Sequence, residues 1–138
     1  MQKAINIIRF LNRLFPGIFV IFTGIMKVFM GQFINTDIGL EDVKKIDSVE
    51  MVFLFYHASG NYVYIIGFTQ MLGGLLLLFK KTSVIGALIC LTVFVNVMFL
   101  NYYFHWGWGM VIFMALLNLS FIITLSFEYN RLKNLLVS

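Results

Sequence analysis

Between Thr82 and Phe127 the chain contains no Lys, Arg, Asp or Glu. A helix rises about 1.5 Å per residue and needs about 20 apolar residues to cross the hydrocarbon of a bilayer. This segment is therefore long enough for two membrane spans, which we predict at 82–104 and 109–127. The turn between them is expected at 105–109, where glycines interrupt the apolar pattern and tryptophans suit the membrane interface.

Two more spans are predicted at 14–31, where the only formal charge is Lys27, and at 60–79. Pro16 is expected near the start of the first helix, where its missing N–H costs least. No small-residue cleavage motif follows this first stretch, which favours a span over a cleaved signal peptide. With 61% apolar and 12% charged residues, the 138-residue chain is predicted to be one all-α domain, an integral membrane four-helix bundle covering 1–138.

Basic residues predict the orientation of the bundle. Seven of them fall on one side of the predicted spans: Lys3, Arg9, Arg13, Lys80, Lys81, Arg131 and Lys133. The other side has only Lys44 and Lys45, in a predicted outer loop at 32–56 that also carries five acidic residues. Since short cytoplasmic loops are rich in Lys and Arg, both termini are expected inside the cell. The outer loop could be a short amphipathic helix on the membrane or a solvated loop.

Polar side chains within the predicted spans are the first candidates for a functional site, because they are costly in hydrocarbon. Lys27, Gln70, Asn96 and Asn118 fall at similar depths, roughly 15 to 22 Å from the basic edge. Glycines recur every seven residues in the first two spans, at Gly17, Gly24, Gly31, Gly60, Gly67 and Gly74. Lys27 and Gln70 each follow one of these glycines by three positions, so both are expected to face neighbouring helices.

This polar layer has two interpretations at the sequence level. It could bind a ligand, or its amides could only hydrogen-bond across helices and set their register. Lys27 could also extend toward the membrane interface, because its stem is apolar and its ammonium prefers water.

Histidines and tyrosines form a second constellation near the predicted outer surface. His57 precedes the second span and His105 follows the third, with Asn101 four residues before His105 and Tyr103 between them. Two histidines could ligate haem, or they could hydrogen-bond a quinone beside the tyrosines. A bis-histidine haem normally lies within a bundle, so the pattern favours quinone as the cofactor, and no metal site is predicted.

Motifs of other function classes are missing from the sequence. It has no HExxH, GxSxG or phosphate loop and no acidic residue inside a predicted span, so no catalytic residue is assigned and an autonomous enzyme is not expected. The basic residues are scattered rather than arranged in a stripe, which argues against nucleic acid as a partner. The lone Cys90 cannot form a disulfide within the chain.

Three segments carry a resemblance to a known family. The run from Arg9 to Lys27 resembles the first helix of DoxX-like membrane proteins, in which R, G, F, G and K occur at similar intervals. The segment GFTQMLGGLLLLFKKTSVIGAL, which begins at Gly67, and the segment from Asn96 to Asn101 are also similar to that family. The family often has Glu where this chain has Gln70, which puts a proton-linked role of that position in doubt.

The resemblance implies a four-helix protein of the bacterial inner membrane, with some relatives linked to quinone-dependent sulfur oxidation or redox stress. We therefore expect a non-catalytic accessory subunit of a redox or quinone-linked complex, whose partners are the lipid bilayer and other membrane or periplasmic redox proteins. The expected lipophilic-ligand site comprises Lys27, Gln70, Asn96, Asn101, Tyr103, His105 and His57. The alternative is a membrane scaffold or assembly protein that binds no small molecule and docks a partner through its outer loop.

Overall fold

The computed structural model describes residues 2–30, 61–105 and 107–137, with side chains as far as residue 134. Within these residues the protein is helical and contains no strand. The helices are α1 (Gln2–Phe29), α3 (Tyr62–Leu78), α4 (Ser83–Tyr103), α5 (Trp108–Phe127) and α6 (Tyr129–Val137). The predicted outer loop at 32–56 and His57 lie outside the described residues.

Three of the described helices, α1, α4 and α5, are long and apolar enough to cross a membrane. Helix α3 is shorter, with 17 residues, but it contains no charged residue. All four expose large apolar side chains, including Phe15, Phe22, Ile65, Phe68, Leu72, Phe99, Ile112 and Leu116. Apolar side chains on this scale face lipid rather than water. The described helices are therefore those of a membrane protein, as the composition predicts.

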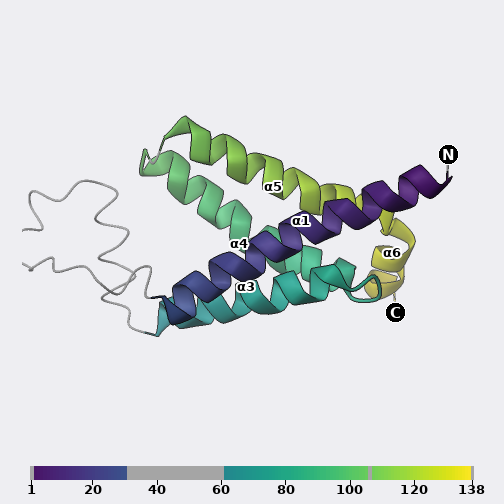
Figure 1. Cartoon of the computed structure of the whole chain (residues 1–138), viewed down its shortest axis with the longest axis horizontal. Coiled ribbons are helices and arrows are strands. Elements are labelled where there is room, and N and C mark those ends of the chain that lie inside the picture. Colours follow the sequence, from purple (N-terminus) through teal and green to yellow (C-terminus); the bar gives the residue numbers. More distant parts are fainter. Residues whose placement is uncertain (1, 31–60, 106, 138) are drawn as a thin grey trace, which may run out of the picture.

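The four long helices contact one another in a ring. Helix α1 lies along α3, α3 contacts α4, α4 contacts α5, and α5 crosses back to α1 (Figure 1). The α1–α3 and α4–α5 pairs lie close at the end that carries the α3–α4 turn, and they diverge toward the α4–α5 turn (Figure 1). The N-terminus and α6 lie at the first of these ends.

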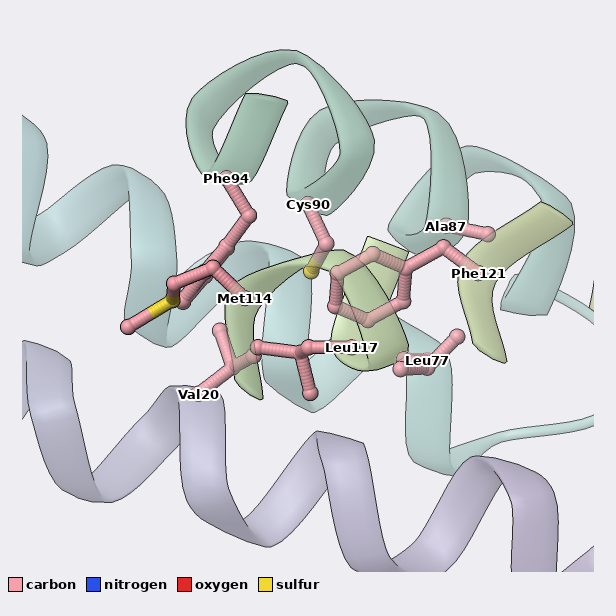
Figure 2. Packing of buried hydrophobic residues seen from close by; sticks show 8 residues of the cluster. All are labelled: Val20, Leu77, Ala87, Cys90, Phe94, Met114, Leu117 and Phe121. Atoms are coloured by element: carbon pink, nitrogen blue, oxygen red, sulfur yellow. The ribbon is translucent and has the colours of Figure 1, made fainter. Parts of the chain in front are cut away.

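One apolar core joins all four long helices. Figure 2 shows its side chains pointing toward one another from α1 (Val20), α3 (Leu77), α4 (Ala87, Cys90 and Phe94) and α5 (Met114, Leu117 and Phe121). The rings of Phe94 and Phe121 lie 5.9 Å apart between centroids and fill the α4–α5 interface. Since lipid provides little hydrophobic drive for helix association, close packing of this kind holds the helices together.

Glycines let the backbones of α1 and α3 approach each other. A β-carbon placed on Gly24 would lie 2.7 Å from the carbonyl oxygen of Gly67, and one on Gly74 would lie 2.8 Å from that of Gly17. Neither space can hold a methyl group, so any larger residue would push the helices apart. The close helix approach predicted from the seven-residue spacing is found at these four glycines, and the structure shows that the two stripes meet each other. Gly31 and Gly60 lie outside the described residues.

The first helix starts earlier than predicted. It begins at Gln2 rather than at residue 14, and Pro16 lies inside it instead of near its start. A proline has no N–H, so the carbonyl of Asn12, four residues earlier, loses its helical hydrogen bond. Ser120 of α5 replaces that bond, because its hydroxyl donates to the Asn12 carbonyl at 3.1 Å. A neighbouring hydroxyl thus makes an internal proline tolerable, as it does in other membrane helices.

Asn12 completes a polar network with α5. Its side-chain nitrogen donates to the Ser120 carbonyl and to the Thr124 hydroxyl, each at 2.9 Å. Its side-chain oxygen lies 2.9 Å from the Ser120 hydroxyl and shares the one hydrogen of that hydroxyl with the Asn12 main-chain carbonyl. The network joins residues more than a hundred positions apart in sequence and sets the rotation of α1 against α5. The network was not predicted from the sequence, in which Asn12 precedes the predicted span at 14–31.

Asn12→Ala is expected to lower the free energy of unfolding by about 1.5 kcal/mol, near the upper end for hydrogen bonds between membrane helices. The substitution removes three interhelical bonds, and it leaves the Thr124 hydroxyl without the donor from α1. Unfolding in mixed micelles followed by circular dichroism measures the change. Asn96→Ala, on the exposed face of α4, is the matched control and should have little effect. Equal losses in the two variants would contradict a structural role for the network.

Helix α6 was not predicted. It follows α5 after Glu128 and returns to the α3–α4 turn, where the Arg131 guanidinium donates to the carbonyl of Lys80. Arg131 also forms an ion pair with Glu128 at 3.3 Å.

The predicted bounds of the last two spans are close to those of the helices. The ends of α4 and α5 lie within one residue of the predicted spans.

Candidate functional site

The last turns of α4 carry a buried amide. The Asn101 side chain is 1% exposed, and its nitrogen donates to the Val97 carbonyl at 2.9 Å. Since a carbonyl can only accept, this bond fixes which end of the amide is nitrogen. The other end, Oδ1, is buried and has no hydrogen-bond partner among the described residues. A buried acceptor without a hydrogen-bond partner lowers the stability of the fold. A ligand with an N–H or O–H group could donate a hydrogen bond to it.

A tight reversal follows Asn101 and places His105 beside it. Helix α4 ends as the amides of Phe104 and His105 donate to the carbonyls of Leu100 and Tyr102. His105 has a φ of 53°, a left-handed conformation that commonly ends helices but is uncommon for a residue with a side chain. Its ring nitrogen Nδ1 lies 3.1 Å from the Tyr103 carbonyl. The reversal therefore holds the imidazole against the end of its own helix.

A partly open cavity of about 430 Å³ lies at this end of the α4–α5 pair. It is lined by Asn101, Tyr102, Tyr103, His105, Gly107, Trp108 and Val111. The Tyr102 ring packs edge-on against Trp108, with centroids 6.0 Å apart, and against Tyr103 at 5.3 Å. The volume lies in the range of small-molecule sites, and aromatic walls with a few polar groups are their usual lining.

The buried polar group of the cavity is an acceptor, and the imidazole can provide a second one. His105 Nδ1 must carry a hydrogen to bond the Tyr103 carbonyl, so in the neutral ring Nε2 is left with a lone pair. Asn101 Oδ1 is the other acceptor. The described lining contains no carboxylate or lysine. The arrangement can therefore bind a neutral, aromatic or lipophilic molecule that carries hydroxyl donors.

Lys27 lies elsewhere, on α1 beside Gly67 of α3, and Gln70 is buried on α3. Gln70 is 2% exposed, and its Oε1 is buried without a partner among the described residues. A β-carbon placed on Gly67 would lie 3.2 Å from the β-carbon of Lys27, so the first bond of the Lys27 side chain points toward α3. The Lys27 side chain is half-buried. Both face a neighbouring helix, as the glycine spacing predicts. Neither is among the residues that line the described cavity.

The prediction that Asn96 belongs to the internal polar layer is wrong. Its side chain is exposed on the outer face of α4, because it follows the buried Phe94 by only two positions, about 200° around the helix. The amide that points inward from α4 is Asn101. On α5, the buried Asn118 donates from its nitrogen to the Phe94 carbonyl of α4 at 3.2 Å. That bond fits the interpretation of Asn118 as an interhelical contact.

Of the seven residues predicted for the site, the structure brings three together: Asn101, Tyr103 and His105. His57 lies outside the described residues. Tyr102, Trp108 and Val111 line the same cavity but were not assigned to the site. The two aromatic residues were noted in the sequence only as interfacial residues, and their spacing around the turn could have marked them as walls of one pocket.

Comparison with known proteins adds one relative. Over 95 residues, 69% of this chain, the sequence is 32% identical to the uncharacterized protein YwoB of Bacillus subtilis (strain 168). The match covers 61% of that protein, so this chain spans less than two thirds of the length of the curated relative. No family model matches the chain, and no solved structure matches it.

Proposed function

We propose that this protein is a DoxX-like membrane protein that acts as an accessory subunit of a quinone-linked redox complex. In this proposal the long helices form a four-span bundle in the bacterial inner membrane, with both termini in the cytoplasm. The cavity at the α4–α5 turn holds the lipophilic ligand. The ligand contacts come from Asn101, Tyr103 and His105, with Tyr102 and Trp108 as aromatic walls.

The observation that carries the proposal is that Asn101 lines an aromatic cavity and has a buried Oδ1 without a hydrogen-bond partner among the described residues. Gln70 and Asn118 also have a buried amide oxygen of this kind, but neither is among the residues that line the cavity. A hydroxyl on a ring that packs against Tyr102 and Trp108 would satisfy the Asn101 acceptor. Quinols carry such hydroxyls on a flat, apolar ring, and we expect the reduced form to bind better than the quinone.

An accessory role fits the chemistry of the described lining. It includes no carboxylate that could accept the protons of a quinol, and the one acidic residue in the described part of the chain, Glu128, is paired with Arg131 at the opposite end. The electrons of a bound quinol would also need an acceptor. The chain would therefore hold the ligand for a partner, either another membrane protein or a periplasmic redox protein.

Asn101→Leu is expected to reduce retention of a quinol about tenfold, because it removes a buried acceptor and its hydrogen bond while keeping the volume of the side chain. Purified protein in mild detergent would be incubated with ubiquinol or menaquinol under argon, passed over a desalting column and extracted for chromatography. The oxidised quinone, measured in parallel, should be retained less by the wild-type protein. Asn96→Leu changes the same residue type on the exposed face of the same helix and is the matched control.

Retention that is equally low in the wild type and in Asn101→Leu would refute the ligand site. The scaffold interpretation would then account for the buried amides. Retention that falls as far in Asn96→Leu as in Asn101→Leu would show that the ligand partitions into the detergent belt rather than into the cavity.

A further inference from the structure

A second set of unsatisfied polar atoms lies at the opposite end of the molecule. Arg9 Nε and Arg13 Nη1 are both buried, and neither has a hydrogen-bond partner among the described residues. The two side chains share one face of α1, because they are four residues apart, and Arg13 Nε donates to the Arg9 carbonyl at 3.3 Å. The guanidinium of Arg9 lies 4.8 Å from the centre of the Phe127 ring at the end of α5. Arg9 is thus held against α5, and Arg13 is held against the backbone of its own helix.

The position of this pair is set by the network beside it. Asn12, one residue before Arg13, is bonded to Ser120 and Thr124 of α5. These bonds fix the rotation of α1, so the direction in which each arginine leaves the helix is also fixed. A preorganised pair of guanidinium groups is the arrangement that binds phosphate oxygens well.

No carboxylate of the described residues is paired with this site. Glu128 is their one acidic residue, and its ion pair is with Arg131. The same end carries the other basic residues of the first and last helices and of the α3–α4 turn, namely Lys3, Lys80, Lys81, Arg131 and Lys133. The local charge is therefore strongly positive, which favours an anionic ligand at this end.

The surroundings distinguish a lipid phosphate from a free one. Ile8, Phe10 and Leu11, which flank Arg9 on α1, expose 56%, 51% and 39% of their surface. Apolar side chains beside a cationic pair suit acyl chains beside a phosphate, and they would not favour a hydrated ion. We propose that Arg9 and Arg13 form a binding site for the phosphate of an anionic membrane lipid. This site is independent of the cavity at the α4–α5 turn.

Native mass spectrometry of the protein released from nanodiscs tests the site. The discs would contain phosphatidylglycerol and phosphatidylcholine with the same acyl chains, and the measured quantity is the ratio of the two lipids retained. In the variant Arg9→Gln/Arg13→Gln this ratio should fall about tenfold, since both guanidinium groups that contact the lipid phosphate directly are lost. In Arg9→Lys/Arg13→Lys, which keeps the charge and guards against misfolding, it should still fall several-fold, because ammonium groups cannot reproduce the geometry of two guanidinium forks.

Two control measurements decide between this site and simpler sources of binding. Arg131→Gln/Lys133→Gln removes the same charge from the same end and should lower the ratio less than the arginine pair does. An unchanged ratio in the Lys pair, or an equal fall in the Arg131 and Lys133 control, would overturn the proposal in favour of a diffuse basic surface. Loss of phosphatidylglycerol from the wild type on addition of inorganic phosphate would overturn it in favour of a free-phosphate site.

Discussion

Gly86→Ala is expected to destabilise the protein by about 3 kcal/mol, at the top of the usual range for overpacking. A β-carbon on Gly86 would collide with the backbone nitrogen of Leu77 and would lie 2.8 Å from the Gly73 carbonyl oxygen. These are main-chain atoms of α3, so no rotamer change can relieve the contact. The α3 and α4 backbones would have to separate, and Leu77 and Ala87 would lose contacts in the common core.

The change can be measured by unfolding in mixed micelles, followed by far-ultraviolet circular dichroism. Gly109→Ala is the matched control, because a β-carbon there would have no neighbouring atom within 4 Å. Its effect should stay within about 0.5 kcal/mol, as for other exposed substitutions. If the two variants lost equal stability, the cost would come from the helix backbone in general and not from the α3–α4 contact.

The second large effect concerns the orientation of the helices in the membrane, and the expected labelling of each cysteine variant in intact cells is either complete or absent. A membrane-impermeant maleimide applied to intact cells is expected to label Gly109→Cys fully and Lys81→Cys only after the cells are permeabilised. The seven basic residues near the α3–α4 turn and the two termini favour the cytoplasmic side for that end. Both positions are exposed, so the side of the membrane decides the labelling and burial does not.

The wild-type protein provides its own control for this experiment. Its one thiol, Cys90, is 1% exposed within the core and should not react in either condition. Labelling of Lys81→Cys in intact cells, together with protection of Gly109→Cys, would invert the proposed topology. It would also place the Arg9 and Arg13 pair outside the cell.

The extents of α4 and α5 were predictable from sequence because hydrocarbon imposes a simple condition. Every backbone group within it must be hydrogen-bonded, so an uncharged stretch of sufficient length forms a helix from end to end. The close approach of α1 and of α3 to a neighbouring helix was predictable for a similar reason. Glycines that recur every seven residues form one stripe, and such a stripe allows a close approach of two backbones. Gln70 and Lys27 follow that stripe, and their direction toward neighbouring helices could be read from it.

Local patterns could not show which asparagine of α4 points inward. Asn96 and Asn101 both fall in an apolar helix with no clear polar face, and only the packing of Phe94 against α5 selects the side that carries Asn101. The start of α1 was predicted too late in the sequence because, within one helix, nothing can replace the hydrogen bond that a proline removes. The hydroxyl that makes Pro16 tolerable belongs to Ser120, which lies more than a hundred residues away.

The amino-acid sequence by itself determined that this chain is helical, belongs in a membrane and carries glycine stripes on α1 and α3 that allow close approach to a neighbouring helix. Those properties depend on composition and on spacing along one helix. The tertiary structure alone decided which polar atoms remain unsatisfied, and hence where the aromatic cavity and the arginine pair lie. An amide or guanidinium group is left without a partner only by the arrangement of side chains from other helices, and no pattern within one segment specifies that arrangement.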